Sequence, residues 1–186
     1  MMPSQSNAQP NQQQSPQQVF EQARRMLALG DAHEAAQRAA LLRSHFPGQT
    51  PMVALHGLAV AALGLHELAV EDLAAAADAT ESALKERASD DVNLPRIADQ
   101  LIRLTTQLAR SYEAMGRRAE ADAALARALG VDPEDPFATQ AKVEMLAGRA
   151  EIDAARAFLD EANGLGLEEL PAAMSAAAVA LARRDT

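Results

Sequence analysis

The sequence has no cysteine and no tryptophan, and aromatic residues make up only 3% of its 186 residues. Without cysteine the chain can form no disulfide, no thiolate nucleophile and no cysteine-based zinc site. The motifs H-E-x-x-H, G-x-x-x-x-G-K-[ST] and G-x-G-x-x-G are also missing from the sequence. We therefore expect a protein that is not an enzyme and that has no catalytic residue, no metal site and no cofactor.

Positive charge and long apolar runs are also scarce. The chain carries 17 basic and 26 acidic residues, for a net charge of −9, and such a surface repels nucleic-acid backbones. The apolar tract near the end, AAMSAAAVALA (172–182), is about half as long as a membrane span. The first residues contain neither a basic cluster nor an apolar core, so we expect no secretory signal. These features predict a cytoplasmic protein that binds neither nucleic acid nor membranes.

Alanine and leucine supply most of the apolar residues, and no segment alternates apolar and polar residues as a strand would. Alanine has the highest helix propensity and allows close helix packing. We therefore predict an all-α fold. Residues 1–17 are rich in Gln, Asn, Ser and Pro, which predicts a disordered tail; self-association of this Gln-rich segment is the alternative. The folded domain is expected over 18–186.

A repeating pattern follows the tail. Gly30 and Gly64 are 34 residues apart, and so are Ala35 and Ala69, each of which follows its glycine by five residues. Gly116 and Ala121 repeat this glycine-to-alanine spacing. Glycine permits the positive φ of a tight turn between two helices, and the small residue leaves room where the helices cross. A period of this length is typical of a helical-repeat array.

The repeats resemble those of the tetratricopeptide-repeat (TPR) family. Residues 102–135 match the family pattern at these positions: Leu108, Ala109, Tyr112, Gly116, Ala121, Leu125, Ala128 and Pro133. Residues 16–49 and 50–83 match less fully, with His56 in place of the usual Leu. A fourth unit around 134–163 contains Gly148 but has one extra residue before its alanine pair, so we expect it to be irregular.

The resemblance implies an α-solenoid of antiparallel helix pairs. The expected units are about 18–49, 50–88, 95–135 and 136–163, followed by a capping helix over 168–184. Tyr112, Leu125, Ala69 and Ala121 are expected to be buried. His56 is expected to be a hydrogen-bonded core histidine.

One interval is longer than the period. Gly64 and Gly116 are separated by 52 residues, an excess of 18, and helical periodicity continues on both sides of the SDDVNLP turn. Because the excess equals five helical turns, we predict a lengthened helical hairpin over about 80–103 that projects roughly 13 Å. A disordered insert is the alternative.

In TPR proteins the first helix of each pair lines a concave groove, and the resemblance places eight candidate residues there: Phe20, Arg24, Leu27, Leu58, Arg103, Gln107, Arg110 and Lys142. The equivalent central positions would be Arg24, Leu58, Arg110 and Lys142. This set predicts an apolar groove with basic flanks inside an acidic shell. Ordinary surface cations on amphipathic helices are the alternative. The sequence has no Asn for the Lys/Asn carboxylate clamp of the chaperone-binding relatives.

These observations predict a non-catalytic adaptor or scaffold that binds a protein or peptide with apolar anchors and acidic flanks. The alternative is a self-assembling structural subunit, a homo-oligomer formed through the projecting hairpin or the Ala-rich C-terminal helix.

Overall fold

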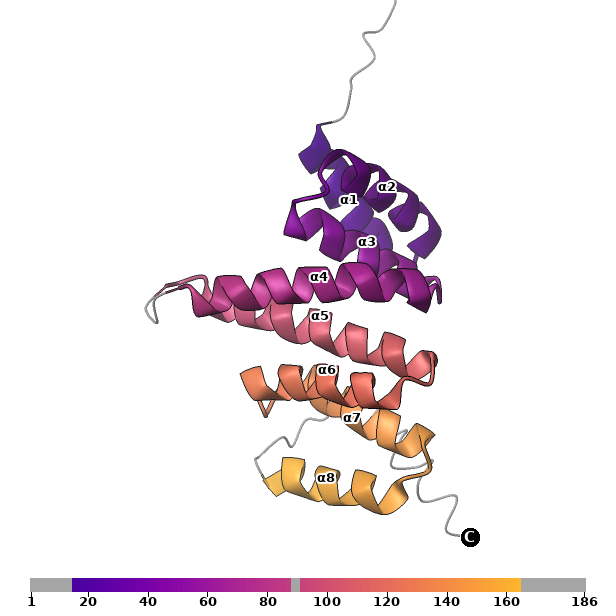
Figure 1. The fold of residues 1–186 in the computed structure, drawn as a ribbon, viewed down its shortest axis with the longest axis vertical. Helices are drawn as coiled ribbons and strands as arrows, with labels where there is room; N and C mark the ends of the chain where they lie inside the picture. The colour runs from indigo at the N-terminus through magenta and orange to yellow at the C-terminus, as the bar shows by residue number, and fades with distance from the viewer. Residues whose placement is uncertain (1–14, 88–90, 165–186) are drawn as a thin grey trace, which may run out of the picture.

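The computed structural model describes residues 15–87 and 91–164, which form eight α-helices stacked in chain order (Figure 1). The helices are α1 (Pro16–Ala28), α2 (Ala32–His45), α3 (Thr50–Ala62), α4 (His66–Lys85), α5 (Leu94–Ala114), α6 (Arg118–Val131), α7 (Pro136–Gly148) and α8 (Ile152–Gly164). They form four antiparallel pairs, and each pair packs on the next. The described part is therefore all-α, as the sequence predicts.

A Schellman turn joins the two helices of each pair. Gly30, Gly64 and Gly116 have φ values of 85°, 75° and 73°, which glycine adopts without strain. In the first turn the N–H of Gly30 donates to the carbonyl of Leu27, and the N–H of Asp31 donates to that of Met26 at 2.9 Å. These bonds satisfy carbonyls that the helix end would leave unpaired, and they reverse the chain within a few residues.

The fourth pair follows the same plan, which corrects the prediction of an irregular unit. Ala150 lies 34 residues after Gly116 and occupies the turn with a φ of 62°. Its N–H donates to Ala147 at 3.0 Å, as in the glycine turns. Gly148, expected at this turn, is instead the last residue of α7. Ala155 is buried 34 residues after Ala121, so the unit contains no extra residue.

The first helix begins earlier than expected. Ser15 caps α1 through a capping box: its hydroxyl accepts a hydrogen bond from the N–H of Gln18 at 3.2 Å, and the Gln18 side chain accepts one from the N–H of Ser15 at 2.9 Å. The prediction that disorder extends to residue 17 is therefore wrong for 15–17. Residues 1–14 and the predicted capping helix (168–184) lie outside the described residues.

The two central helices, α4 of the second pair and α5 of the third, are longer than the others and project beyond them (Figure 1). Helix α4 has 20 residues where α2 and α6 have 14, and α5 has 21 where α1, α3 and α7 have 13. At 1.5 Å per residue the projection is about 9 Å for α4 and about 12 Å for α5. This is slightly less than predicted, because four of the extra residues lengthen the connection between α4 and α5.

Small residues occupy the helix crossings. Ala69, Ala121 and Leu125 are fully buried, as expected. At Gly57 on α3 an added Cβ would lie 3.0 Å from the Cγ of Leu73 on α4, so the glycine sets the close approach of these helices. The prediction that Tyr112 is buried is wrong, because this residue is only partly buried. It lies near the turn, where the guanidinium of the exposed Arg117 lies 4.6 Å from the centroid of its ring.

A buried acid links the first two pairs. Asp72 on α4 accepts a hydrogen bond from Arg43 on α2 at 2.8 Å and pairs with the ring of His56 on α3 at 2.5 Å. His56 is thus hydrogen-bonded, as expected, although its ring remains partly exposed. Because a buried carboxylate is costly unless it is paired, this contact stabilises one packing of the two pairs.

Candidate functional site

The predicted groove residues lie on the first helices of the four pairs. Phe20, Arg24 and Leu27 are on α1, Leu58 is on α3, Arg103, Gln107 and Arg110 are on α5, and Lys142 is on α7. The two α1 apolar residues and Leu58 pack partly against the core.

The structure changes the set of equivalent central positions. Arg24, Leu58 and Arg110 each lie six residues before the turn residue of their pair. Six residues before Ala150 is Glu144, so an acid occupies the fourth position. Lys142 is equivalent to Leu108 and His56 instead. The prediction that three of the four central positions are basic is therefore wrong. The error arises because the sequence pattern places the fourth turn at Gly148 instead of Ala150.

Arg110 is fixed against α7. Its Nη2 lies 3.0 Å from Glu144 Oε2, and its guanidinium carbon lies 4.7 Å from the centroid of the Phe137 ring. Both contacts cross from the third pair to the fourth. The cation therefore holds α5 and α7 together.

The other predicted groove cations also have acidic neighbours. Arg24 lies 3.4 Å from Glu21, and Lys142 lies 3.4 Å from Asp122 on α6. Arg103 lies 3.0 Å from Asp99, and the hydrogen bond that it donates to that carboxylate raises the pKa of Arg103. The predicted groove cations are thus paired charges rather than a row of free cations.

A recess of about 320 Å³ lies between α5 and α7. Ala114, Met145 and Gly148 form its apolar part, and Arg110, Glu113 and Glu144 supply charged groups. Only Arg110 belongs to the set predicted from the sequence. The spacing from Gly116 to Ala150 would have identified Glu144, had the fourth turn been placed correctly.

No protein-family model matches the sequence, and no curated protein matches it. Among solved structures, the chain is similar to a thermophilic TPR protein from Thermus thermophilus, with 18% identity, a TM-score of 0.46, and coverage of 90% of this chain and 99% of that one. It is also similar to MamA from Desulfovibrio magneticus, with 17% identity, a TM-score of 0.35, and coverage of 83% and 97%. A double mutant of MamA gives 16% identity, a TM-score of 0.34, and coverage of 81% and 94%.

The chain is TPR-like. This description rests on its own helix pairs, on their 34-residue register and on the four Schellman turns. The low identities and TM-scores limit the likeness to the arrangement of helices.

An ion network lies beside the recess and shares Glu113 with it. The side chain of Arg149 is only 4% exposed and donates to Glu113 on α5 at 2.9 Å and to Asp122 on α6 at 3.0 Å. The hydrogen bond from Arg149 lowers the pKa of Glu113. For Asp122, burial alone would raise the pKa, but the hydrogen bond from Arg149 and the charge of Lys142 lower it. The network fixes the backbone beside the recess.

Proposed function

We propose that this chain is a non-catalytic adaptor that binds a peptide segment of another protein along its first helices. The recess between α5 and α7 carries the proposal, because it combines apolar surface with charged groups at hydrogen-bonding positions. A concave site of this kind suits an apolar anchor side chain flanked by polar backbone. Among the described residues no three His, Asp or Glu side chains gather as metal ligands.

The paired charges refine the expected ligand. A ligand carboxylate at Arg110 would have to compete with Glu144, so we expect the apolar anchor to supply most of the affinity and exposed charges to affect selection. Toward α1, Arg24 is exposed but pairs with Glu21 at 3.4 Å, so an acidic flank there would have to compete in the same way. No described helix is long and apolar enough to cross a membrane.

Peptides selected from a random library on the immobilised full chain would test the proposal. Ala114→Arg places a long side chain in the recess at an exposed position, and it should lower the affinity for the selected peptides at least about tenfold. The matched control is Ala126→Arg on α6, which is equally an exposed alanine but does not line the recess. If the peptides bind both variants equally, or if the selection enriches no peptide, the proposed binding site in the recess is wrong.

A further inference from the structure

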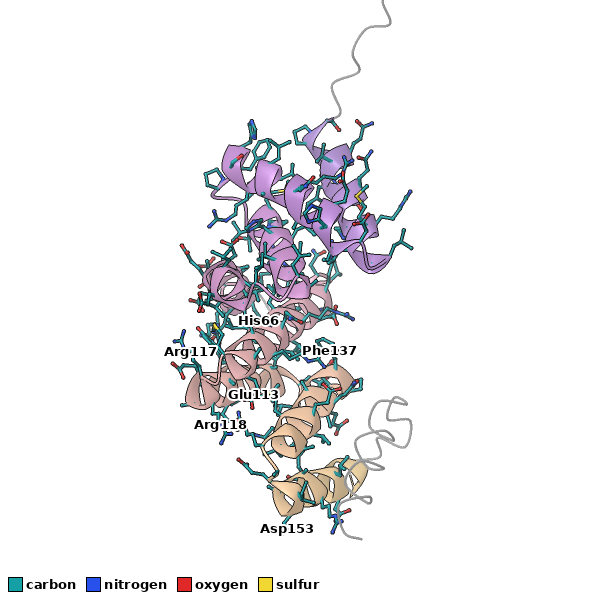
Figure 2. All side chains as sticks on the ribbon, turned by 90° about the vertical axis from the view of Figure 1, so that its right-hand side faces the viewer. His66, Glu113, Arg117, Arg118, Phe137 and Asp153 are labelled. Carbon is teal, nitrogen blue, oxygen red and sulfur yellow. The ribbon has the colours of Figure 1, made fainter. Side chains whose placement is uncertain are left out.

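The edge formed by the turns within the pairs exposes several leucines. We call it the turn edge and define it as residues 29–34, 63–68, 115–120 and 149–154. Figure 2 views the molecule from this side, with His66, Arg117, Arg118 and Asp153 following one another along the stack. Four leucines here are exposed: Leu29 by 79%, Leu63 by 37%, Leu65 by 47% and Leu68 by 62%. Exposed apolar groups gathered on one edge indicate an interaction surface.

Two of these leucines stand where polar residues would stabilise the helix. Leu65 is the N-cap of α4 and makes no side-chain cap, whereas Asp31 caps α2 by accepting from the N–H of Glu34 at 3.3 Å. Leucine is among the poorest N-cap residues. Leu68 occupies the third position of α4, where α2 has Glu34 and α6 has Glu120. An acid there is favoured by the helix dipole, so both leucines lower local stability.

The charges along the edge differ in sign between the first and the third turn. The first turn carries the acids Asp31 and Glu34, of which Glu34 pairs with Arg38 at 2.8 Å. The third turn carries Arg117 and Arg118, of which Arg117 pairs with Glu120 at 2.8 Å. Among the described residues, the Arg118 side chain makes no ion pair with an acid. The leucines of the second turn lie between the acidic and the basic ends.

The order of acidic turn, leucines and basic turn is complementary to the same order read in the opposite direction. If a second copy lies antiparallel across the edge, the leucines meet at the centre, and the acids of each copy's first turn face the arginines of the other copy's third turn. A two-fold interface needs such a self-complementary surface.

We propose that the turn edge of the first three pairs binds a second copy of this chain in a two-fold antiparallel dimer. The leucines form the apolar centre and the charged turns form the polar rim, which is the usual arrangement of an interface. None of the residues that line the recess between α5 and α7 belongs to the turn edge, so this dimer does not rest on the proposed adaptor function. Because the net charge of −9 opposes association, we expect a dissociation constant in the micromolar range.

Sedimentation velocity and light scattering on the full chain, from about one to a few hundred micromolar, test the dimer. The wild type should shift from monomer to dimer over this range. The double variant Leu65→Asp, Leu68→Glu introduces the residue types of the first turn, and it should raise the dissociation constant more than about tenfold. Its melting temperature should equal or exceed that of the wild type, which separates lost association from misfolding. Leu41→Glu, at an exposed leucine of α2 off the edge, is the matched control and should leave the dimer intact.

A charge exchange tests the antiparallel orientation. Arg118→Glu and Glu34→Arg should each weaken the dimer about three- to tenfold, and the two substitutions combined should restore it, because both contacts are then reversed together. If the wild type stays monomeric over this concentration range, the proposal is overturned, and the turn edge would instead be a surface for a different protein. A dimer that ignores the leucine substitutions, or a combined variant weaker than either single one, also overturns it.

Discussion

Arg149 binds the carboxylate of Glu113, which lies 36 residues earlier in the chain, across the boundary between the third and fourth helix pairs. The same guanidinium reaches Asp122 on α6. One largely buried cation therefore joins α5 and α6 to the turn that follows α7. Removal of this cation would leave two acids close together without their main partner.

Arg149→Met should destabilise the fold by about 2–3 kcal/mol, less than for a fully buried pair because Glu113 and Asp122 retain some contact with water. Urea unfolding followed by circular dichroism measures the change. Arg103→Met is the control, because Arg103 pairs with Asp99 on an exposed helix surface, where such pairs contribute about 0.2–1 kcal/mol. Equal losses in the two variants would show that the network adds nothing beyond a surface pair.

Stability should also fall in acid. The pKa values of Glu113 and Asp122 are lowered in the folded chain from ordinary values of 4.5 and 3.8. Groups shifted in this direction stabilise the fold above their unfolded pKa, and that contribution disappears as the pH falls through the folded pKa. Between about pH 5 and 3 the wild type should therefore lose more stability than Arg149→Met, in which the shifts are largely removed. Parallel curves of unfolding free energy against pH would contradict this assignment.

Ala150→Gly should stabilise the chain by about 1 kcal/mol, because glycine adopts the positive φ of this turn without the steric cost that alanine meets. Gly148→Ala, two residues earlier, should also stabilise, by roughly 0.5–1 kcal/mol, since Gly148 is helical and an added Cβ meets nothing within 4 Å. Thermal melts of both variants give the comparison. A loss of stability in Ala150→Gly would argue against the turn conformation.

Gly57→Ala should destabilise by about 1–3 kcal/mol through overpacking. The added methyl would lie 3.0 Å from the side chain of Leu73 and 3.1 Å from its backbone nitrogen, so α3 and α4 would have to move apart. Gly130→Ala on α6 is the matched control, because its Cβ would meet open space and should raise helix propensity. If the two substitutions have the same sign, the close crossing at Gly57 is wrong.

The fold was largely predictable because its determinants are local. Gly30, Gly64 and Gly116 mark three turns directly, and the period between them predicts paired helices. Ala150 was missed because alanine carries no local indication of a positive φ; only strict counting from Gly116 would have placed it. That single error then shifted the fourth pair and placed Lys142 instead of Glu144 at the fourth central position of the predicted groove.

The candidate site was less predictable, because it depends on contacts between residues far apart in the chain. The amphipathic pattern places Arg110 on a groove face, but it does not show that Glu144 and Phe137 bind it. Leu65 and Leu68 are visible in the sequence, yet they look like ordinary apolar residues until the turn shows that one of them is an N-cap. Which of these side chains are paired and which are exposed can be seen only when the helices are assembled in the stack.

The two long central helices, α4 and α5, also affect how the chain acquires its structure. Contacts in the stack join neighbouring helices, so folding can begin in one pair and spread outward without closing long loops. The interfaces of α4 with α3 and α5 and that of α5 with α6 are the most extensive in the stack. Arg127 on α6 adds ion pairs to Asp78 and Glu81 of α4. The centre of the chain is therefore the natural nucleus. Its backbone amides should exchange with solvent most slowly, and protection should decline toward α1 and α8.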